Sequence, residues 1–278
     1  MRERVVIKWG GGLITKKDVL KQPQLDIIGS LADQIIECNK EGIDIILVHG
    51  AGSFGHLKAK TYRLAEGRLN SPEANSLGPL TQDEAIEEVR NDMMELNRHI
   101  MDALTKRDIS AVSLPPHQWA NETGTEFNGS LEHFIQAPKG ITMVTFGDVV
   151  SCRDEREFGI LSGDDIVARL AVEVPHVSRL VFAIGGVDGV LAVPPSIAQP
   201  EDLIEVLAPE HVFDGEHESA IDVTGGIGLK VERGFYVASH GIDVIMVNGG
   251  HPSRVLDACK GIEVRGTKLS VASDFKQQ

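Results

Sequence analysis

Residues 43–50 read "IDIILVHG", a nearly continuous apolar run that ends at a histidine and a glycine. Hydrophobicity of this kind is typical of a strand that is buried on both faces, as the strands of a parallel sheet are. Four further runs resemble it: "RVVIKW" (4–9), "ITMVTFGDVV" (141–150), "RLVFAIGG" (179–186) and "DVIMVNGG" (243–250). Together the five runs predict a mainly parallel central sheet.

Helical patterns lie between these runs. Apolar residues recur every three or four positions in four segments: 25–36, 82–106, 164–174 and 230–241. Thr81 and Glu84 have the spacing of a capping box at the start of the second segment. Residues 187–222 show little periodicity and predict an irregular or hairpin connection. Strands that alternate with helices predict an α/β fold, a three-layer αβα sandwich with a mainly parallel central sheet.

Composition limits the function classes. The 278 residues carry a formal net charge of −14, which argues against nucleic acid or an anionic membrane as a partner. The N-terminus lacks the apolar segment of a signal peptide, and no apolar run has transmembrane length, so we expect a cytoplasmic protein. Three widely spaced cysteines, Cys38, Cys152 and Cys259, match no metal-ligand pattern, and we expect reduced thiols.

A glycine-rich loop follows the 43–50 run. Within "LVHGAGSFGH" (47–56), Gly50, Gly52 and Gly55 have the G-x-G-x-x-G spacing of dinucleotide-binding loops. That fingerprint requires a second strand with an acidic residue about 20 residues further on. The segment that follows, "HLKAKTYRLAEGRLNSPEANSLG", is polar and contains no strand-like run. The sequence therefore disfavours a dinucleotide site.

An anion site explains the loop better. Glycines let backbone N–H groups approach an anion, and the start of a helix adds partial positive charge. His56 stands where it could donate a hydrogen bond to the same anion. Three similar junctions occur in the chain: "IKWGGGLITKK" (7–17), "SGDD" (162–165) and "DVTGGIGLK" (222–230). Because ligands gather at the carboxyl edge of a parallel sheet, the four junctions predict an extended polyanion site.

Positive charge must be concentrated near such a site, since the whole chain is acidic. The lysines close to the glycine-rich junctions are Lys8, Lys16, Lys17, Lys58, Lys60 and Lys230, and we expect them to form a local cluster. The spacing G-x-x-x-x-G-K-[ST] does not occur, which excludes a P-loop enzyme.

These motifs, with "GDVV", "VDGV" and "VNGGHPSRV", occur in the order that is found in the amino acid kinase superfamily. The chain most resembles the isopentenyl phosphate kinases of archaeal-type mevalonate metabolism, and "GSFGH" is the most specific part of the resemblance. Fosfomycin kinase has a related glycine–histidine loop. The resemblance implies the amino acid kinase fold, as one domain over 1–278 with an acceptor-binding lobe at about 1–175 and a nucleotide-binding lobe at about 176–278.

The resemblance also implies ATP and Mg²⁺ as cofactors, a small-molecule phosphate as substrate and a homodimer. Lys17 and His56 would be the catalytic residues. Ala51 and Gly163, with His56, would bind the acceptor phosphate. The residues implied to contact ATP are Lys8, Gly10, Gly11, Gly52, Gly186, Gly226 and Lys230. Asp148 would organise the lysines.

These implied roles fit the chemistry. A phosphate monoester is largely dianionic at neutral pH, so no general base has to remove a proton from it. The difficulty lies in bringing two polyanions together in line, which lysines, Mg²⁺ and aligned N–H groups can achieve by positioning and electrostatics. His56 would then serve as a hydrogen-bond donor. Ile86, Val89 and Met93 of the 82–106 helix could line an apolar pocket for the acceptor's tail, or could be ordinary core residues.

Three departures from the family pattern affect the prediction. Gly12 stands where the family usually has Ser, and Ala51 where it has Gly. In "GGVDGVLAVPP", Gly185 and Gly186 replace a Thr-Asp pair beside the nucleotide's base and ribose. Two alternatives follow: a kinase for another small phosphate or phosphonate, such as a different prenyl phosphate or fosfomycin, or a non-catalytic ligand-binding homologue with a degraded nucleotide pocket.

Overall fold

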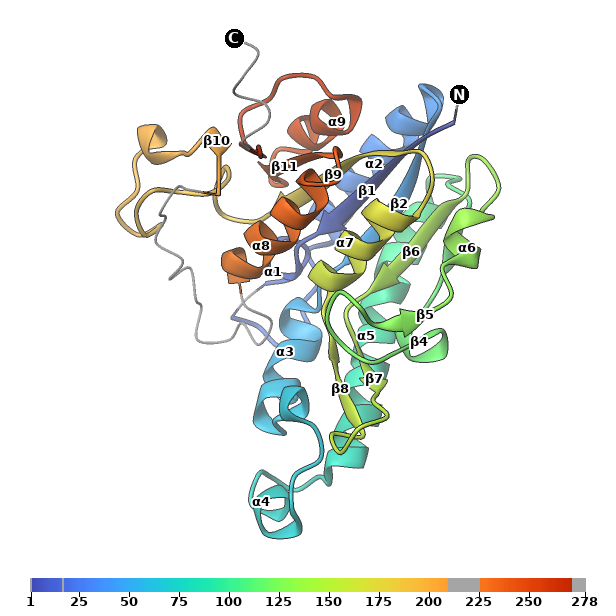
Figure 1. Ribbon diagram of the computed structural model, residues 1–278, viewed down its shortest axis with the longest axis vertical. Coiled ribbons are helices and arrows are strands. Elements are labelled where there is room, and N and C mark those ends of the chain that lie inside the picture. Colours follow the sequence, from blue (N-terminus) through green and yellow to red (C-terminus); the bar gives the residue numbers. More distant parts are fainter. Residues whose placement is uncertain (1, 17, 210–225, 272–278) are drawn as a thin grey trace.

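The central element of the computed structural model, which describes residues 2–16, 18–209 and 226–271, is an eight-stranded sheet (Figure 1). In spatial order its strands are β10 (Val206–Leu207), β12 (Thr267–Leu269), β11 (Asp243–Asn248), β9 (Val177–Ile184), β1 (Glu3–Trp9), β2 (Ile43–His49), β6 (Thr142–Phe146) and β3 (Ala111–Ser113). Neighbouring strands run parallel except β11 and β12. The predicted mainly parallel sheet is confirmed.

Helices cover both faces of this sheet and complete the predicted αβα sandwich. On one face lie α2 (Leu25–Lys40), α5 (Gln82–Thr105) and α9 (Pro252–Lys260). The other face carries α6 (Glu132–Ile135), α7 (Gly163–Glu173) and α8 (Gly226–Ala238). The capping box at the start of α5 is present, because Thr81 and Glu84 each accept from the other's backbone N–H. No helix in the described part of the chain combines the length and apolar character that a membrane span needs.

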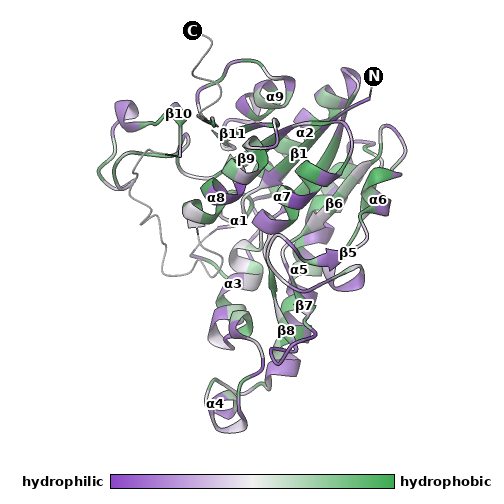
Figure 2. Ribbon diagram, viewed as in Figure 1, coloured by the Kyte–Doolittle hydropathy of each residue, from purple (hydrophilic) through white to green (hydrophobic). Residues whose placement is uncertain are grey.

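Strand β1 shows why the sequence runs are continuously apolar. Val5, Ile7 and Trp9 pack into the core under α2 and α9, while Val6 packs into the core under α7. Side chains of a strand alternate between faces, so a strand covered on both sides needs apolar residues at every position. Hydrophobic colouring follows the central strands in Figure 2. The exception is Lys8, on the α7 face and 5% exposed.

A smaller part projects from the edge of the sandwich (Figure 1). It contains α3 (Gly52–Thr61), η1 (Leu64–Glu66), α4 (Ser71–Asn75), the first turns of α5 and the hairpin of β7 (Asp148–Ser151) and β8 (Phe158–Leu161). A separate apolar cluster holds it together, with Tyr62, Met93 and Phe158 among its members. The remaining elements are α1 (Gly11–Ile14), η2 (Pro116–Gln118), β4 (Ala120–Asn121), β5 (Asn128–Gly129) and η3 (Pro200–Asp202).

The structure corrects one predicted strand. The run at 141–150 forms two strands, because the chain leaves the main sheet at Gly147 and β7 then pairs with β8. A Cβ atom at Gly147 would lie only 3.1 Å from the Gly163 nitrogen, so glycine allows this close passage. The described part of the connection at 187–222, residues 187–209, contains a Leu191–Leu203 antiparallel bridge, η3 and β10, and β10 joins the main sheet through β12. All three cysteines are free and buried.

Candidate active site

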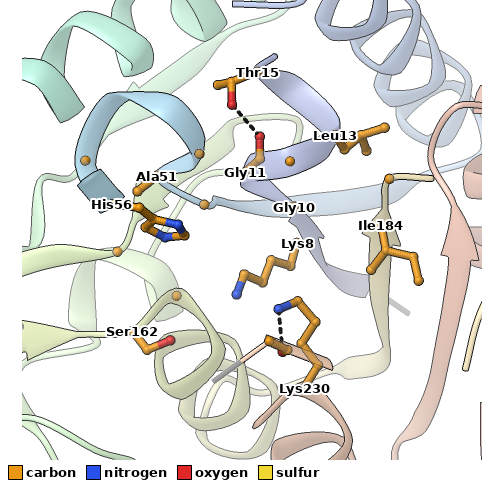
Figure 3. A pocket seen from close by; sticks show the side chains of 18 of the residues that line it. Lys8, Gly10, Gly11, Leu13, Thr15, Ala51, His56, Ser162, Ile184 and Lys230 are labelled. Atoms are coloured by element: carbon orange, nitrogen blue, oxygen red, sulfur yellow. Dashed lines mark hydrogen bonds between the residues drawn. The ribbon is translucent and has the colours of Figure 1, made fainter. Parts of the chain in front are cut away.

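A cavity of about 660 Å³ opens at the carboxyl ends of β1, β2 and β9 (Figure 3). Parts of four strand-to-helix junctions line it: 10–15, 50–56, 162–163 and 226–230. Between residues 56 and 110, all of which are described, the chain forms helices and turns but no strand. The second strand of a dinucleotide-binding unit is therefore missing after the loop at 50–55.

Glycines allow two of these junctions to touch. A Cβ atom on Gly11 would lie 2.2 Å from the Gly52 nitrogen, and a Cβ atom on Gly50 would lie 2.6 Å from the Gly11 nitrogen. Gly52 also has a positive φ of 51°, which glycine adopts without strain. The loop after β1 (residues 10–12, the β1 loop) and the loop after β2 (residues 50–52, the β2 loop) thus cross backbone against backbone.

Two lysines face one buried carboxylate below this crossing. Lys8 Nζ lies 2.5 Å from Asp164 Oδ1, and Lys230 Nζ lies 3.4 Å from Asp164 Oδ2. Lys230 also donates to the Gly226 carbonyl at 2.9 Å (Figure 3). Burial alone would raise the pKa of Asp164, but the charges of Lys230 and Lys8 outweigh it and hold that pKa below its usual value. One carboxylate therefore fixes two ammonium groups at the cavity wall.

On the other side of the crossing, two helices start at the cavity. α3 begins at Gly52 and α7 at Gly163, so the N–H groups of both first turns lie at its edge. His56, one turn into α3, projects its ring into the cavity (Figure 3). Ser162 caps α7 through a 3.1 Å bond from the Asp164 N–H to its Oγ. Helix starts and an imidazole donor make this side suited to a phosphate group.

His49 ends β2 directly beneath the β2 loop. Its ring is fully buried, stacks on Phe146 with centroids 4.8 Å apart, and contacts the Gly50 carbonyl and Asn97 Oδ1 at 3.2 and 3.3 Å. Burial lowers the pKa of His49 to about 4, and these hydrogen bonds offset only part of the effect. The ring is therefore neutral at physiological pH and acts as part of the core under the loop.

The cavity continues from His56 into an apolar end. The side chains there come from α3, α5 and the β7–β8 hairpin: Ala59, Val89, Met93, Val149 and Ile160. Ile86, which the sequence grouped with Val89 and Met93, belongs to the apolar cluster of the projecting part and is 7% exposed. An apolar end beside an anion-binding end suits a substrate with a phosphate head and a hydrocarbon tail.

The structure brings most of the predicted site residues to one cavity. Lining it are Lys8, Gly10, Gly11, Ala51, Gly52, His56, Gly163, Gly186, Gly226 and Lys230. Lys17, the predicted catalytic lysine, lies outside the described residues. Of the wider lysine cluster, Lys58 turns away from this cavity and pairs with Asp92 at 2.7 Å and Glu88 at 2.6 Å on α5. The expected single cluster of lysines is thus wrong at Lys58.

The prediction for Asp148 is not met at Lys8 and Lys230, because Asp164 is the carboxylate that pairs with these two lysines. Asp148 accepts from the ring and the backbone N–H of His117, at 2.7 and 3.1 Å, and from the Val149 N–H at 2.8 Å. In the sequence, Asp164 resembles an ordinary residue of a helix start, since acidic residues are common in the first turn of a helix. Its one distinguishing signal was its position beside a second aspartate.

Gly185 and Gly186 line the cavity, and only the first of them is crowded. A Cβ atom on Gly185 would lie 2.9 Å from the Gly12 carbonyl oxygen and 3.0 Å from the Leu13 Cα. Gly186 has no atom within 4 Å of such a Cβ but has a φ of +84°. Asp188, two residues after Gly186, pairs with Arg254 and Arg265 at 2.7 and 2.6 Å. These ion pairs anchor the segment to the C-terminal strands and helix.

Comparison with known proteins identifies the class. The chain belongs to the amino acid kinase family, whose sequence pattern matches residues 3–248. Within this family it is similar to isopentenyl phosphate kinases. It is 30% identical to the Methanothermobacter thermautotrophicus enzyme, over 96% of this chain and 98% of that one. The Thermoplasma acidophilum enzyme is 31% identical, over 92% and 96%.

A solved isopentenyl phosphate kinase structure matches the fold with a TM-score of 0.78 at 26% identity, covering 96% of this chain and 100% of the other. The predicted family, the amino acid kinase fold and the assignment as a phosphotransferase are confirmed by these likenesses.

Proposed function

We propose that this chain transfers the γ-phosphoryl group of ATP to isopentenyl phosphate, which gives ADP and isopentenyl diphosphate. The observation that carries the proposal is the backbone contact between Gly11 and Gly52, with paired lysines on one side and His56 beside an apolar end on the other. Two anion-binding loops in contact are what a transfer between two phosphates requires, because the reacting atoms must approach within about 3–3.5 Å.

On the nucleotide side, Lys8, Lys230 and the backbone at Gly10, Gly11, Gly52, Gly186 and Gly226 would contact ATP. Lys8 and Lys230 are pre-oriented by Asp164, so they need no reorganisation when phosphates arrive. The proposal for Lys17, that it stabilises the γ-phosphoryl group during transfer, rests on the sequence.

On the acceptor side, Ala51, His56 and Gly163 would bind the phosphate of the substrate. The dianion needs no deprotonation, so His56 would donate a hydrogen bond to a phosphate oxygen and hold it in line. The prenyl tail would lie along Val89 and Met93, away from water.

Mg²⁺ belongs to the proposal as a ligand of the nucleotide. Among the described residues no group of three or more carboxylate, histidine or cysteine side chains could hold a metal ion. Mg²⁺ commonly binds through substrate phosphates and retains several waters, and Asp18 is a cavity-lining carboxylate that could accept from such a water. When bound, the ion neutralises phosphate charge.

The two lobes, about 1–175 for the acceptor and about 176–278 for the nucleotide, remain part of the proposal, as do a homodimer and a cytoplasmic location. Of the residues proposed to contact ATP, Gly186, Gly226 and Lys230 belong to the second of these lobes, and Lys8, Gly10, Gly11 and Gly52 belong to the first. Light scattering of the purified protein would test the dimer.

A coupled assay for release of the nucleoside diphosphate tests the function, with isopentenyl phosphate, dimethylallyl phosphate, geranyl phosphate and fosfomycin as acceptors and ATP or GTP as donor. We expect the highest kcat/KM with ATP and isopentenyl phosphate. Faster turnover of fosfomycin or a longer prenyl phosphate would favour the related-kinase alternative. Calorimetry that detects no ATP binding in the presence of Mg²⁺ would favour the non-catalytic homologue.

A further inference from the structure

One hydroxyl group joins the two anion loops. Thr15 Oγ1 donates to the Gly11 carbonyl at 2.8 Å and accepts from the Ser53 N–H at 2.9 Å. Gly11 follows β1, whereas Ser53 belongs to the first turn of α3. Thr15 is 1% exposed and lies at the cavity wall, beside Gly11 in Figure 3. Its hydroxyl therefore makes simultaneous bonds to the nucleotide side and the acceptor side.

Helix α3 takes its cap from this distant residue. Ala51, at the N-cap position, provides no side-chain hydrogen bond. Thr15 fills that role for the Ser53 N–H, one of the helix's first donors. A Cβ atom on Gly52 would lie 2.1 Å from Thr15 Oγ1, so the contact is as close as the backbone permits. The first turn of α3, which leads to His56, is thereby placed relative to Gly11.

Lys21 makes a second contact between the segment after β1 and the first turn of α3. The Lys21 N–H donates to the Ser53 carbonyl at 3.3 Å, and Lys21 has a left-handed φ of 53°. Its ammonium group pairs with Asp92 of α5, which is 4% exposed and also binds Lys58 of α3. The hydrogen bond that Lys21 donates to Asp92 raises the pKa of Lys21, so the lysine remains charged at neutral pH.

We propose that Thr15 and the Lys21–Asp92 pair are positioning residues for phosphoryl transfer, which hold the β1 loop and the β2 loop at a fixed separation while both carry anions. The inference rests on the proposed function, in which two polyanions occupy neighbouring loops. Repulsion between the two polyanions would push the loops apart, and the contacts made by Thr15 and by the Lys21–Asp92 pair resist that movement. Transfer depends steeply on this separation, because a misplacement of about 1 Å can lower a rate by roughly 10²-fold.

Isosteric variants test Thr15 in the full-length enzyme with ATP, Mg²⁺ and isopentenyl phosphate. Thr15→Val should lower kcat by roughly 10- to 100-fold and leave both KM values within about threefold, since each half-site persists. Thr15→Ser keeps the hydroxyl and should restore kcat to within about threefold. Thr145→Val is the matched control, because Thr145 is equally buried and its hydroxyl donates to the Leu114 carbonyl, away from the loops. It should lower the melting temperature without lowering kcat.

A Thr15→Val enzyme that loses stability but keeps its kcat would overturn the proposal. If that variant does not fold, Lys21→Met tests the proposal in its place, because Lys21 is 36% exposed and its replacement leaves the core intact. We expect a kcat lowered by roughly three- to tenfold, against no change for Lys40→Met, whose lysine pairs with Glu37 on α2. An unchanged kcat in Lys21→Met would contradict the proposal.

One readout is independent of the reaction. In Thr15→Val, the Ser53 amide should exchange its hydrogen with solvent at least about tenfold faster in NMR experiments, because its acceptor is gone. If the unaltered enzyme fails to phosphorylate isopentenyl phosphate, the proposed function fails, and the positioning inference is then judged on this exchange rate. An unchanged rate would overturn it.

Discussion

The Nζ atom of Lys8 lies 2.5 Å from Oδ1 of Asp164, and both side chains are almost completely removed from water. Lys230 approaches the same carboxylate from α8. In the described part of the chain, one buried carboxylate therefore pairs with two ammonium groups. The two lysines give this wall of the cavity positively charged side chains in an otherwise acidic protein.

Removing that carboxylate should destabilise the protein and make its thermal stability depend more strongly on bound ATP. Asp164→Asn removes the carboxylate that Lys8 and Lys230 both contact, so we expect a loss of about 3–5 kcal/mol of unfolding free energy. Bound ATP would supply new negative charge, so ATP should raise the melting temperature more in this variant than in the unaltered enzyme. Thermal unfolding with and without ATP measures both effects.

Asp33→Asn is the matched control, because Asp33 pairs with Arg107 at the surface and is 53% exposed. Its stability should change by less than about 1 kcal/mol. An Asp164→Asn enzyme that is as stable as this control would show that Asp164 does not balance the lysines.

The free energy of unfolding should decrease as the pH is lowered, because of His49. Its folded pKa of about 4 lies below the value of 6.5 for a free histidine, so between these values the unfolded chain binds more protons. The contribution is complete above pH 6.5 and is lost progressively as the pH falls to 4, by about 3 kcal/mol at most. Urea unfolding at pH 7, 5.5 and 4.5 should show a steeper fall for the unaltered protein than for His49→Gln.

The corresponding change at His133, an exposed residue of α6, should leave that pH slope as it is. An NMR titration of the His49 ring gives the direct check. A ring that becomes protonated near pH 6.5 would rule out the buried environment described for it.

Acceptor binding should depend on His56. His56→Ala removes a donor that points into the cavity, so we expect a KM for isopentenyl phosphate raised roughly tenfold or more and an ATP KM that is nearly unchanged. Steady-state kinetics with each substrate varied in turn measures the split. If both constants and kcat stay the same, His56 has no part in the site.

For Lys17 we predict the opposite pattern. Its proposed partner is charge that develops during transfer, so Lys17→Ala should lower kcat by roughly 10²-fold or more and change ATP affinity little. Single-turnover measurements at saturating ATP would separate chemistry from binding. A variant with weaker ATP binding but unchanged kcat would contradict the role.

Tail length should respond to Met93 and not to Ile86. Met93→Ala enlarges the apolar end of the cavity, so kcat/KM for geranyl phosphate should rise by roughly tenfold relative to isopentenyl phosphate. Ile86→Ala removes a similar volume from the cluster of the projecting part, outside the cavity lining. Each variant should lose about 2–5 kcal/mol of stability, which makes them a matched pair. Equal selectivity in both would assign Met93 to the core alone.

The sequence predicted those features that depend on local patterns. β1 and β2 were recognisable because strands covered on both faces are apolar at every position, and the cavity edge because each glycine junction follows such a strand. Which carboxylate faces Lys8 depends instead on how α7 packs against β1. Asp148 and Asp164 both adjoin a glycine at the cavity, so the sequence alone did not separate them.

Two other features have the same origin in tertiary contacts. Lys58 follows a glycine loop closely in sequence, yet helix α3 turns it towards Asp92 of α5. Thr15 resembles an ordinary polar residue of a turn, and only the crossing of the two loops gives its hydroxyl two backbone partners. The break between β6 and β7 at Gly147 also depends on a tertiary contact, because the close approach of Gly163 cannot be recognised from the sequence.

The most direct test of the central claim is ³¹P NMR of the purified protein with ATP, Mg²⁺ and isopentenyl phosphate. Two phosphate loops in contact predict that the monophosphate signal disappears as ADP and a prenyl diphosphate appear in equal amounts. Consumption of ATP that releases inorganic phosphate and leaves isopentenyl phosphate unchanged, or no consumption at all, would contradict it.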